Sequence, residues 1–114
     1  IQYADFCFVW WVGGSDTDMD QKREAIQKAE EEAIKKTVKH SEMVTGQMSI
    51  NPDKVQSLLD NPTDNLPTIH KWNGYHILFD GNHRVVADVI KGEDETLCWV
   101  ADLDKYFNKT GWLK

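Results

Sequence analysis

The chain has 114 residues, of which 40% are hydrophobic and 28% charged, a balance typical of a single globular domain. Its 13 basic and 19 acidic residues give a formal net charge of −6. Proteins that coat nucleic acid carry the opposite sign, so any contact with DNA or RNA needs a local basic patch. The longest apolar stretch, Phe6 to Val12, is only as long as a strand, so we expect no membrane-spanning helix.

Residues 1–40 predict a strand followed by an amphipathic helix. Residues 5–12 are rich in aromatic and β-branched side chains and end at a pair of glycines, as strands do. From Asp20 to about Lys39, core-type residues recur at helical spacing, namely Ile26, Ala29, Ala33, Ile34, Thr37 and Val38. Acid–base pairs four residues apart support the same helix, namely Glu24–Lys28, Glu31–Lys35 and Glu32–Lys36. His40 then follows as a favourable charge at the helix C-terminus.

The middle of the chain predicts a short helix and a β-hairpin. Asn51 followed by Pro52 is the expected start of a helix that turns Val55, Leu58 and Leu59 inward. Residues 68–72 and 75–79 are strand-like and flank Asn73-Gly74, which predicts a type I′ turn. If Trp72 pairs with Tyr75, then His70 and His76 lie on opposite faces of the hairpin. We therefore do not expect these two histidines to share a metal.

The C-terminal third predicts a helix from Asn82 to Lys91, with Asn82 as its N-cap and Gly92 as its terminating residue. A strand at residues 96–101 and a short helix at 102–108 follow. Together the elements predict one α/β (α+β) domain over residues 1–114, a small mixed sheet with a hairpin and about three helices. Cys7 and Cys98 lie in apolar runs, which predicts buried free thiols and a cytoplasmic location.

Residues 79–84 combine a strand end, a tight glycine turn and a helix start. His83 and Arg84 fall in the first helical turn, where the helix dipole disfavours each cation by about 0.3–1 kcal/mol. An anion bound to the free N–H groups of that turn would explain them. Arg84 would then grip phosphate or carboxylate oxygens, and His83 would donate or shuttle a proton. The alternative is that Arg84 pairs with Asp88 and that His83 is a partly buried helix residue.

This segment resembles the phosphate-binding turn of the ParB/sulfiredoxin superfamily, whose small α/β domains open a helix with Gly-x-His-Arg or Gly-x-Arg-Arg. The similarity covers about residues 42–104 and includes Thr45-Gly46-Gln47, Leu66-Pro67, Trp72-Asn73-Gly74-Tyr75 and Trp99-Val100-Ala101-Asp102. The order of elements is that of small phage or plasmid members. The resemblance implies that ATP or another nucleoside triphosphate is held by Gly81, Asn82, His83 and Arg84, approached by Thr45 and Gln47. It also implies that Asp80 positions Mg²⁺ or a water.

Two differences from known members of the superfamily limit which of their activities we expect in this chain. Sulfiredoxins need a cysteine nucleophile where this chain has Asn82, and an amide cannot attack a phosphoryl or sulfinyl group, so sulfinic acid reduction is excluded. Partition proteins carry a Gly-Glu-Arg-Arg turn and a following helix-turn-helix, which this sequence does not show. Reading of centromere DNA is therefore not expected.

The sequence thus predicts a nucleotide-binding phosphohydrolase or phosphotransferase, with a nuclease as a variant. His83, Asp80 and Arg84 are the candidate catalytic residues, and Asp88 and Glu42 are further carboxylates that could serve phosphoryl transfer. The alternative is a non-enzymatic, phage-type interaction module that binds a protein through its aromatic surface. Tryptophans in predicted strands would form that surface, namely Trp10, Trp11 and Trp99.

Overall fold

The computed structural model describes residues 2–3, 16–46, 49–110 and 112–114. Its elements follow in chain order: β1 (Gln2–Tyr3), α2 (Asp16–Glu31), β2 (Ile34–Lys39), the 3-10 turn η1 (His40–Glu42), β3 (Met43–Thr45), α3 (Pro52–Asp60), β4 (Thr68–Trp72), β5 (Tyr75–Asp80), α4 (Asn82–Ile90), β6 (Glu95–Asp102) and the 3-10 turn η2 (Leu103–Lys105). The strand predicted over residues 5–12, with its Cys7, Trp10 and Trp11, lies outside the described residues. No helix in the described ranges has the length and apolar character needed to cross a membrane.

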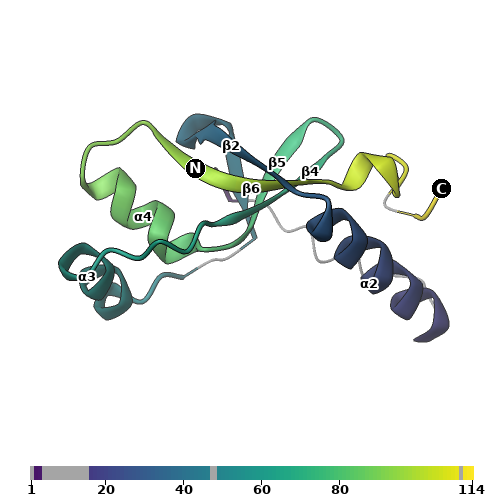
Figure 1. Ribbon diagram of the computed structural model, residues 1–114, viewed down its shortest axis with the longest axis horizontal. Helices are drawn as coiled ribbons and strands as arrows, with labels where there is room; N and C mark the ends of the chain where they lie inside the picture. Colours follow the sequence, from purple (N-terminus) through teal and green to yellow (C-terminus); the bar gives the residue numbers. More distant parts are fainter. Residues whose placement is uncertain (1, 4–15, 47–48, 111) are drawn as a thin grey trace.

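The described strands form one mixed sheet in the order β1-β3-β5-β4-β6-β2 (Figure 1). The pairs β1–β3, β3–β5 and β4–β6 are parallel, whereas β4–β5 and β2–β6 are antiparallel. With three described helices and a hairpin, this is the small mixed α/β fold that the sequence predicts. The carboxyl ends of β3 and β5 meet at the same edge, because the two strands are parallel and neighbours.

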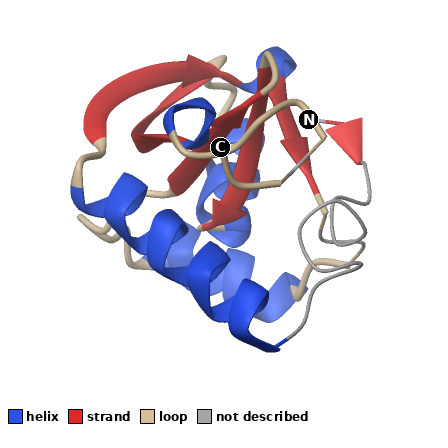
Figure 2. Cartoon of the chain, turned by 90° about the vertical axis from the view of Figure 1, so that its right-hand side faces the viewer, coloured by secondary structure: helices blue, strands red, loops and turns tan. Residues whose placement is uncertain are grey.

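The helices cover both faces of this sheet. Successive residues of a strand point to opposite faces, so Ile77 and Leu78 of β5 mark the two sides. Ile77 belongs to a buried cluster with Ala29 of α2, and Leu78 belongs to a second cluster with Val85 of α4. Figure 2 shows α2 nearest the viewer and running below the strands, whereas Figure 1 shows α3 and α4 together at the opposite end of the molecule from α2.

The prediction of one helix from Asp20 to Lys39 is wrong for the second half of that span. Helix α2 runs from Asp16 to Glu31, and the rest of that span is strand β2, which pairs antiparallel with β6 from Ile34–Val100 to Lys39–Glu95. The spacing of β-branched residues in this span suits a strand as well as a helix, and pairing with a distant strand decides the outcome. The predicted pairs Glu31–Lys35 and Glu32–Lys36 therefore do not lie on one helix.

The position of His40 also differs from the prediction, which placed it as a favourable charge at a helix C-terminus. It is buried in η1, between β2 and β3, and its Nε2 lies 2.7 Å from Oγ1 of Thr96. Glu32, freed from its predicted helical partner, instead accepts a hydrogen bond from Nζ of Lys105 at 2.6 Å and another from the hydroxyl of Tyr106. The positions of His40 and Glu32 both differ from prediction because residues 34–39 form a strand and not the second half of a helix.

The helix cap and the hairpin agree with the sequence. Oδ1 of Asn51 accepts from the backbone N–H of Asp53 at 2.9 Å, and α3 begins at Pro52. Asn73 and Gly74 have φ of 49° and 79°, as a type I′ turn requires. Trp72 pairs with Tyr75, and the same register puts His70 and His76 on opposite faces.

The C-terminal elements are nearly as predicted. Helix α4 ends at Ile90, and Gly92 terminates it with φ of 84° and an N–H that donates to Val89 at 3.0 Å. Strand β6 is one residue longer at each end than the predicted strand, and its Cys98 is fully buried. The predicted helix at residues 102–108 is reduced to the single turn η2.

Candidate functional site

The turn between β5 and α4 is built around Gly81. Its φ of 86° and ψ of 25° are left-handed, which costs any other residue strain. A Cβ at this position would lie 2.8 Å from Cα of Pro67, so the turn has no room for a side chain. Oδ1 of Asp80 accepts from the N–H of Gly81 at 2.9 Å, which makes the Asp80 carboxylate part of the turn.

Asn82 is not the N-cap that the sequence predicts. Gly81 occupies the cap position, so α4 begins one residue earlier and Asn82 is its first helical residue. The Asn82 side chain is buried, and its Oδ1 accepts from Oγ1 of Thr45 at 2.6 Å. Thr45 therefore comes to the turn, as expected, but the amide faces the end of β3. Gln47 lies outside the described residues.

His83 links the first turn of α4 to the start of α3. Its Nε2 accepts from the backbone N–H of Asn51 at 3.1 Å. Because Nε2 acts as an acceptor, the ring in this arrangement carries its proton on Nδ1. The histidine is half-buried and lines the neighbouring cavity.

Arg84 combines the two alternatives that the sequence leaves open. Its Nε lies 3.6 Å from Oδ1 of Asp88, so the predicted pair with that carboxylate forms. Its Nη1 donates to the backbone oxygens of Thr63 at 2.6 Å and Asn65 at 3.0 Å, which ties the connection between α3 and β4 to α4. A guanidinium has five N–H donors, and the two on Nη2 have no partner among the described residues.

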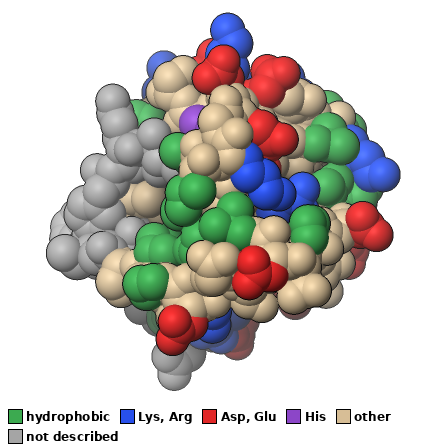
Figure 3. Space-filling view, turned by 90° about the vertical axis from the view of Figure 1, so that its left-hand side faces the viewer, with side chains coloured by type: hydrophobic (Ala, Val, Ile, Leu, Met, Phe, Trp, Pro, Cys, Tyr) green, Lys and Arg blue, Asp and Glu red, His purple; other side chains and the backbone are tan. Residues whose placement is uncertain are grey.

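These side chains line a cavity of about 440 Å³ at the carboxyl end of β5. The first turn of α4 forms one wall, Asn65 and Pro67 form a second, and Lys54 and Leu58 of α3 form a third. Figure 3 faces this end of the molecule, where Lys and Arg side chains lie beside apolar ones. Lys54 is a cation of the site that sequence reasoning missed, because nothing local in α3 indicates that it will face α4.

The carboxylates proposed for a metal do not gather at this cavity. Asp80 is exposed and engaged in its own turn, Glu42 is exposed on η1, and Asp88 is buried behind Arg84. Nowhere in the described ranges do three His, Cys, Asp or Glu side chains come close enough to hold a metal ion. Mg²⁺ is often bound by one or two carboxylates plus substrate phosphates, so Asp80 fits as one ligand of such a shared site.

Of the three tryptophans predicted to form an aromatic surface, only Trp99 lies in the described residues, and it is exposed. Trp99 is 39% exposed and Leu97 is 44% exposed, and the two share one face of β6 because they are two residues apart. Nζ of Lys35 lies 5.2 Å from the Trp99 ring centroid. Trp72, by contrast, is buried and donates from Nε1 to the Asn108 carbonyl at 3.0 Å.

Comparison with known proteins adds no assignment, because no model of a protein family matches this chain and no curated protein matches it either.

Proposed function

We propose that this chain binds the phosphate groups of ATP or another nucleoside triphosphate at the first turn of α4. The meeting of the N-termini of α3 and α4 at a cavity of about 440 Å³ carries the proposal. The first turn of α4 has no side-chain cap, so it presents free backbone N–H groups, and both helix N-termini carry roughly half a positive charge, which favours a bound anion. A ParB/sulfiredoxin-like fold is part of this proposal, because the phosphate turn of that superfamily has the residue order of Gly81 to Arg84.

Three side chains supply donors for such a ligand. Arg84 offers the two N–H groups of Nη2, His83 offers Nδ1–H, and Lys54 adds an ammonium group from α3. Phe79 lines the same cavity and is 59% exposed. One face of its ring stacks on His70 with centroids 4.3 Å apart, and the exposed part of the ring would stack on a nucleobase.

We further propose that the bound nucleotide is hydrolysed or donates its phosphoryl group, with nuclease cleavage as a variant of the same chemistry. Asp80 would hold Mg²⁺ jointly with phosphate oxygens, which supplies charge neutralisation. His83 would act as general acid or base through Nδ1. Arg84 would stabilise the charge that develops on the transferred group.

A thermal unfolding series with ATP, CTP, GTP and ADP, each with and without Mg²⁺, tests the binding step. A nucleotide at 100 times its Kd should add about 2.7 kcal/mol to the stability and raise the midpoint by several degrees. Lys54→Ala should reduce this shift, because it removes one cation from the cavity wall. Lys91→Ala is the matched control, because Lys91 is exposed at the opposite end of α4.

The comparison of these two variants distinguishes a specific site from general charge attraction. Equal losses in Lys54→Ala and Lys91→Ala would show that the nucleotide is held by the overall charge rather than by the cavity. No shift of the wild-type midpoint with any nucleotide would overturn the proposal. Arg84→Ala is less informative, because Arg84 also holds the backbone at Thr63 and Asn65.

A protein-interaction module is the second candidate function. The observation that favours it is the exposed pair Leu97 and Trp99 on one face of β6, since exposed tryptophans are frequent anchors of protein interfaces. This function predicts that Trp99→Ala abolishes binding to a purified partner and that Lys54→Ala leaves it unchanged. The nucleotide-binding function predicts the reverse pattern in the unfolding series.

A further inference from the structure

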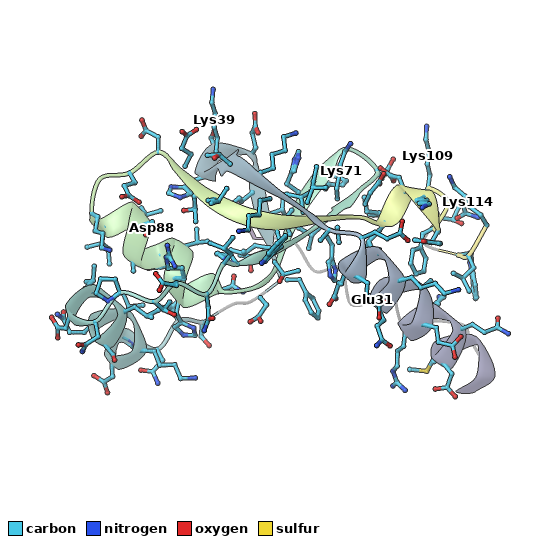
Figure 4. The ribbon with its side chains drawn as sticks, viewed as in Figure 1. Glu31, Lys39, Lys71, Asp88, Lys109 and Lys114 are labelled. Carbon is cyan, nitrogen blue, oxygen red and sulfur yellow. The ribbon has the colours of Figure 1, made fainter. Side chains whose placement is uncertain are left out.

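Behind Arg84, three buried polar side chains form a hydrogen-bonded chain that the proposed function does not use. Oγ1 of Thr96 donates to Oδ2 of Asp88 at 2.7 Å, and Nε2 of His40 lies 2.7 Å from the same hydroxyl oxygen. All three residues are less than 8% exposed. They come from β6, α4 and η1, so the chain joins α4 to the sheet, and Figure 4 shows Asp88 on the side of α4 that faces β6.

The donors in this chain have a fixed direction. Thr96 has a single hydroxyl hydrogen, and Asp88 accepts it. His40 must therefore donate from Nε2 to the Thr96 oxygen, which fixes a proton on that ring nitrogen. At the other end, Oδ1 of Asp88 lies 3.6 Å from Nε of Arg84. The contacts thus run without interruption from His40 through Thr96 and Asp88 to the guanidinium.

The hydrogen-bonded side chains hold Arg84 from one side, and backbone carbonyl groups hold it from another. Thr96 holds Oδ2 of Asp88, so the remaining oxygen faces Nε of Arg84. The carbonyl oxygens of Thr63 and Asn65 hold Nη1. A planar guanidinium held at Nε and at Nη1 has little rotational freedom left, and Arg84 lines the cavity of the candidate site.

Burying an aspartate, a threonine and a histidine together is costly compared with an apolar core of the same volume, even when their hydrogen bonds are made. In the described part of the chain, no buried side-chain nitrogen or oxygen lacks a hydrogen-bond partner, so the network is fully satisfied. Such a network specifies one arrangement of the groups it joins. Pre-organised donors bind an anion without losing further side-chain freedom.

We infer that His40, Thr96 and Asp88 are positioning residues that hold the Arg84 guanidinium in the orientation used to bind a phosphate group. The ligand in this statement rests on the proposed function, but the orientation of Arg84 can be measured without any ligand. None of the three residues lines the cavity, and Arg84 is the cavity residue that their network contacts, through Asp88.

The orientation is tested by NMR of the arginine Nε–H groups. The only arginines of the sequence are Arg84 and Arg23, and the Arg23 side chain is 61% exposed, so its signal is an internal control. In Thr96→Val, which keeps the side-chain volume but loses the hydroxyl, the Arg84 Nε–H should exchange with solvent faster than in the wild type. Thr96→Ser keeps the hydroxyl and should preserve the wild-type exchange rate. Thr37→Val, on an exposed position of β2, is the matched control.

Titration of the same variants with MgATP completes the experiment. Thr96→Val should raise the Kd by roughly 2- to 30-fold, and Thr96→Ser should restore it. An Arg84 exchange rate in folded Thr96→Val equal to that of the wild type would overturn the inference, even if ATP binds. If the wild type binds no nucleotide, the proposed function fails, while the Arg84 signal still decides whether the three residues position it. Asp88→Asn gives the same readout should Thr96→Val not fold.

Discussion

The backbone N–H of Asn51 donates to Nε2 of His83 at 3.1 Å, although the two residues are 32 positions apart in the sequence. Asn51 is the N-cap of α3, and His83 lies in the first turn of α4. The hydrogen bond therefore joins the starts of two helices and brings their positive dipole ends to one cavity. A basic side chain in the first turn of a helix, unfavourable by itself, here serves as an acceptor for the neighbouring helix.

His83→Ala should lower the free energy of unfolding, because it leaves the Asn51 N–H without its acceptor. We expect a loss of about 0.5–1.5 kcal/mol, the usual net value of one hydrogen bond. His83→Gln places a carbonyl oxygen on a side chain of similar reach and should recover part of the loss. Urea denaturation of the three proteins measures both effects. A His83→Ala variant as stable as the wild type would show that water replaces this contact at no cost.

Gly81→Ala should destabilise the domain more than Gly74→Ala. Both glycines have positive φ, 86° and 79°, so each substitution carries the left-handed penalty of about 1–2 kcal/mol. A Cβ at Gly81 would also meet Pro67 at 2.8 Å, whereas nothing lies within 4 Å of a Cβ at Gly74. The difference between the two urea midpoints isolates this contact. Equal losses would mean that Pro67 moves aside freely.

The parts of the fold that were predicted correctly from the sequence depend on local chemistry. The cap at Asn51, the turn at Asn73-Gly74 and the helix end at Gly92 each involve residues no more than a few positions apart. Their backbone angles follow from side-chain oxygens near a helix start or from the freedom of glycine to adopt positive φ.

The parts that were missed depend on contacts between distant residues. Strand β2 exists because residues 34–39 pair with residues 95–100, and no pattern within residues 20–39 reveals that partner. His40 meets Thr96 across 56 positions, and Arg84 meets Thr63 across 21. Lys54 reaches the cavity only through the packing of α3 beside α4. The sequence therefore located the glycine turn and the arginine that follows it, but not which groups surround that arginine.

The thiol of Cys98 should be unreactive in the folded protein. Burial, with a smaller contribution from the charge of Asp88, raises the pKa of the Cys98 thiol to about 11, so almost none of it is thiolate at pH 8. Because the thiolate is the reactive form, a thiol reagent should label Cys98 slowly in native buffer and quickly in concentrated urea. A Cys7→Ser background leaves Cys98 as the one cysteine to follow. Equal rates in the two solvents would contradict the buried position.

The stability of the domain should fall as the pH drops below neutrality, because of His70. Burial lowers the pKa of His70 from its usual 6.5, against the opposing effect of its hydrogen bond to Glu30 at 3.0 Å. The unfolded chain therefore takes up this proton first. The stability that His70 provides is complete above pH 6.5 and is lost as the pH falls from 6.5 to the lower value in the folded state. The slope from one such proton cannot exceed about 1.4 kcal/mol per pH unit.

Two variants assign this pH dependence to His70 when urea unfolding is followed from pH 7.5 to 5. His70→Gln removes the titrating ring and should flatten the curve by the share that His70 contributes. Glu30→Gln removes the carboxylate that raises the pKa of His70, so the loss of stability should continue to a lower pH than in the wild type. If His70→Gln leaves the curve as steep as before, the loss of stability belongs to other groups, and the carboxylate of Glu30 compensates fully for the burial of His70.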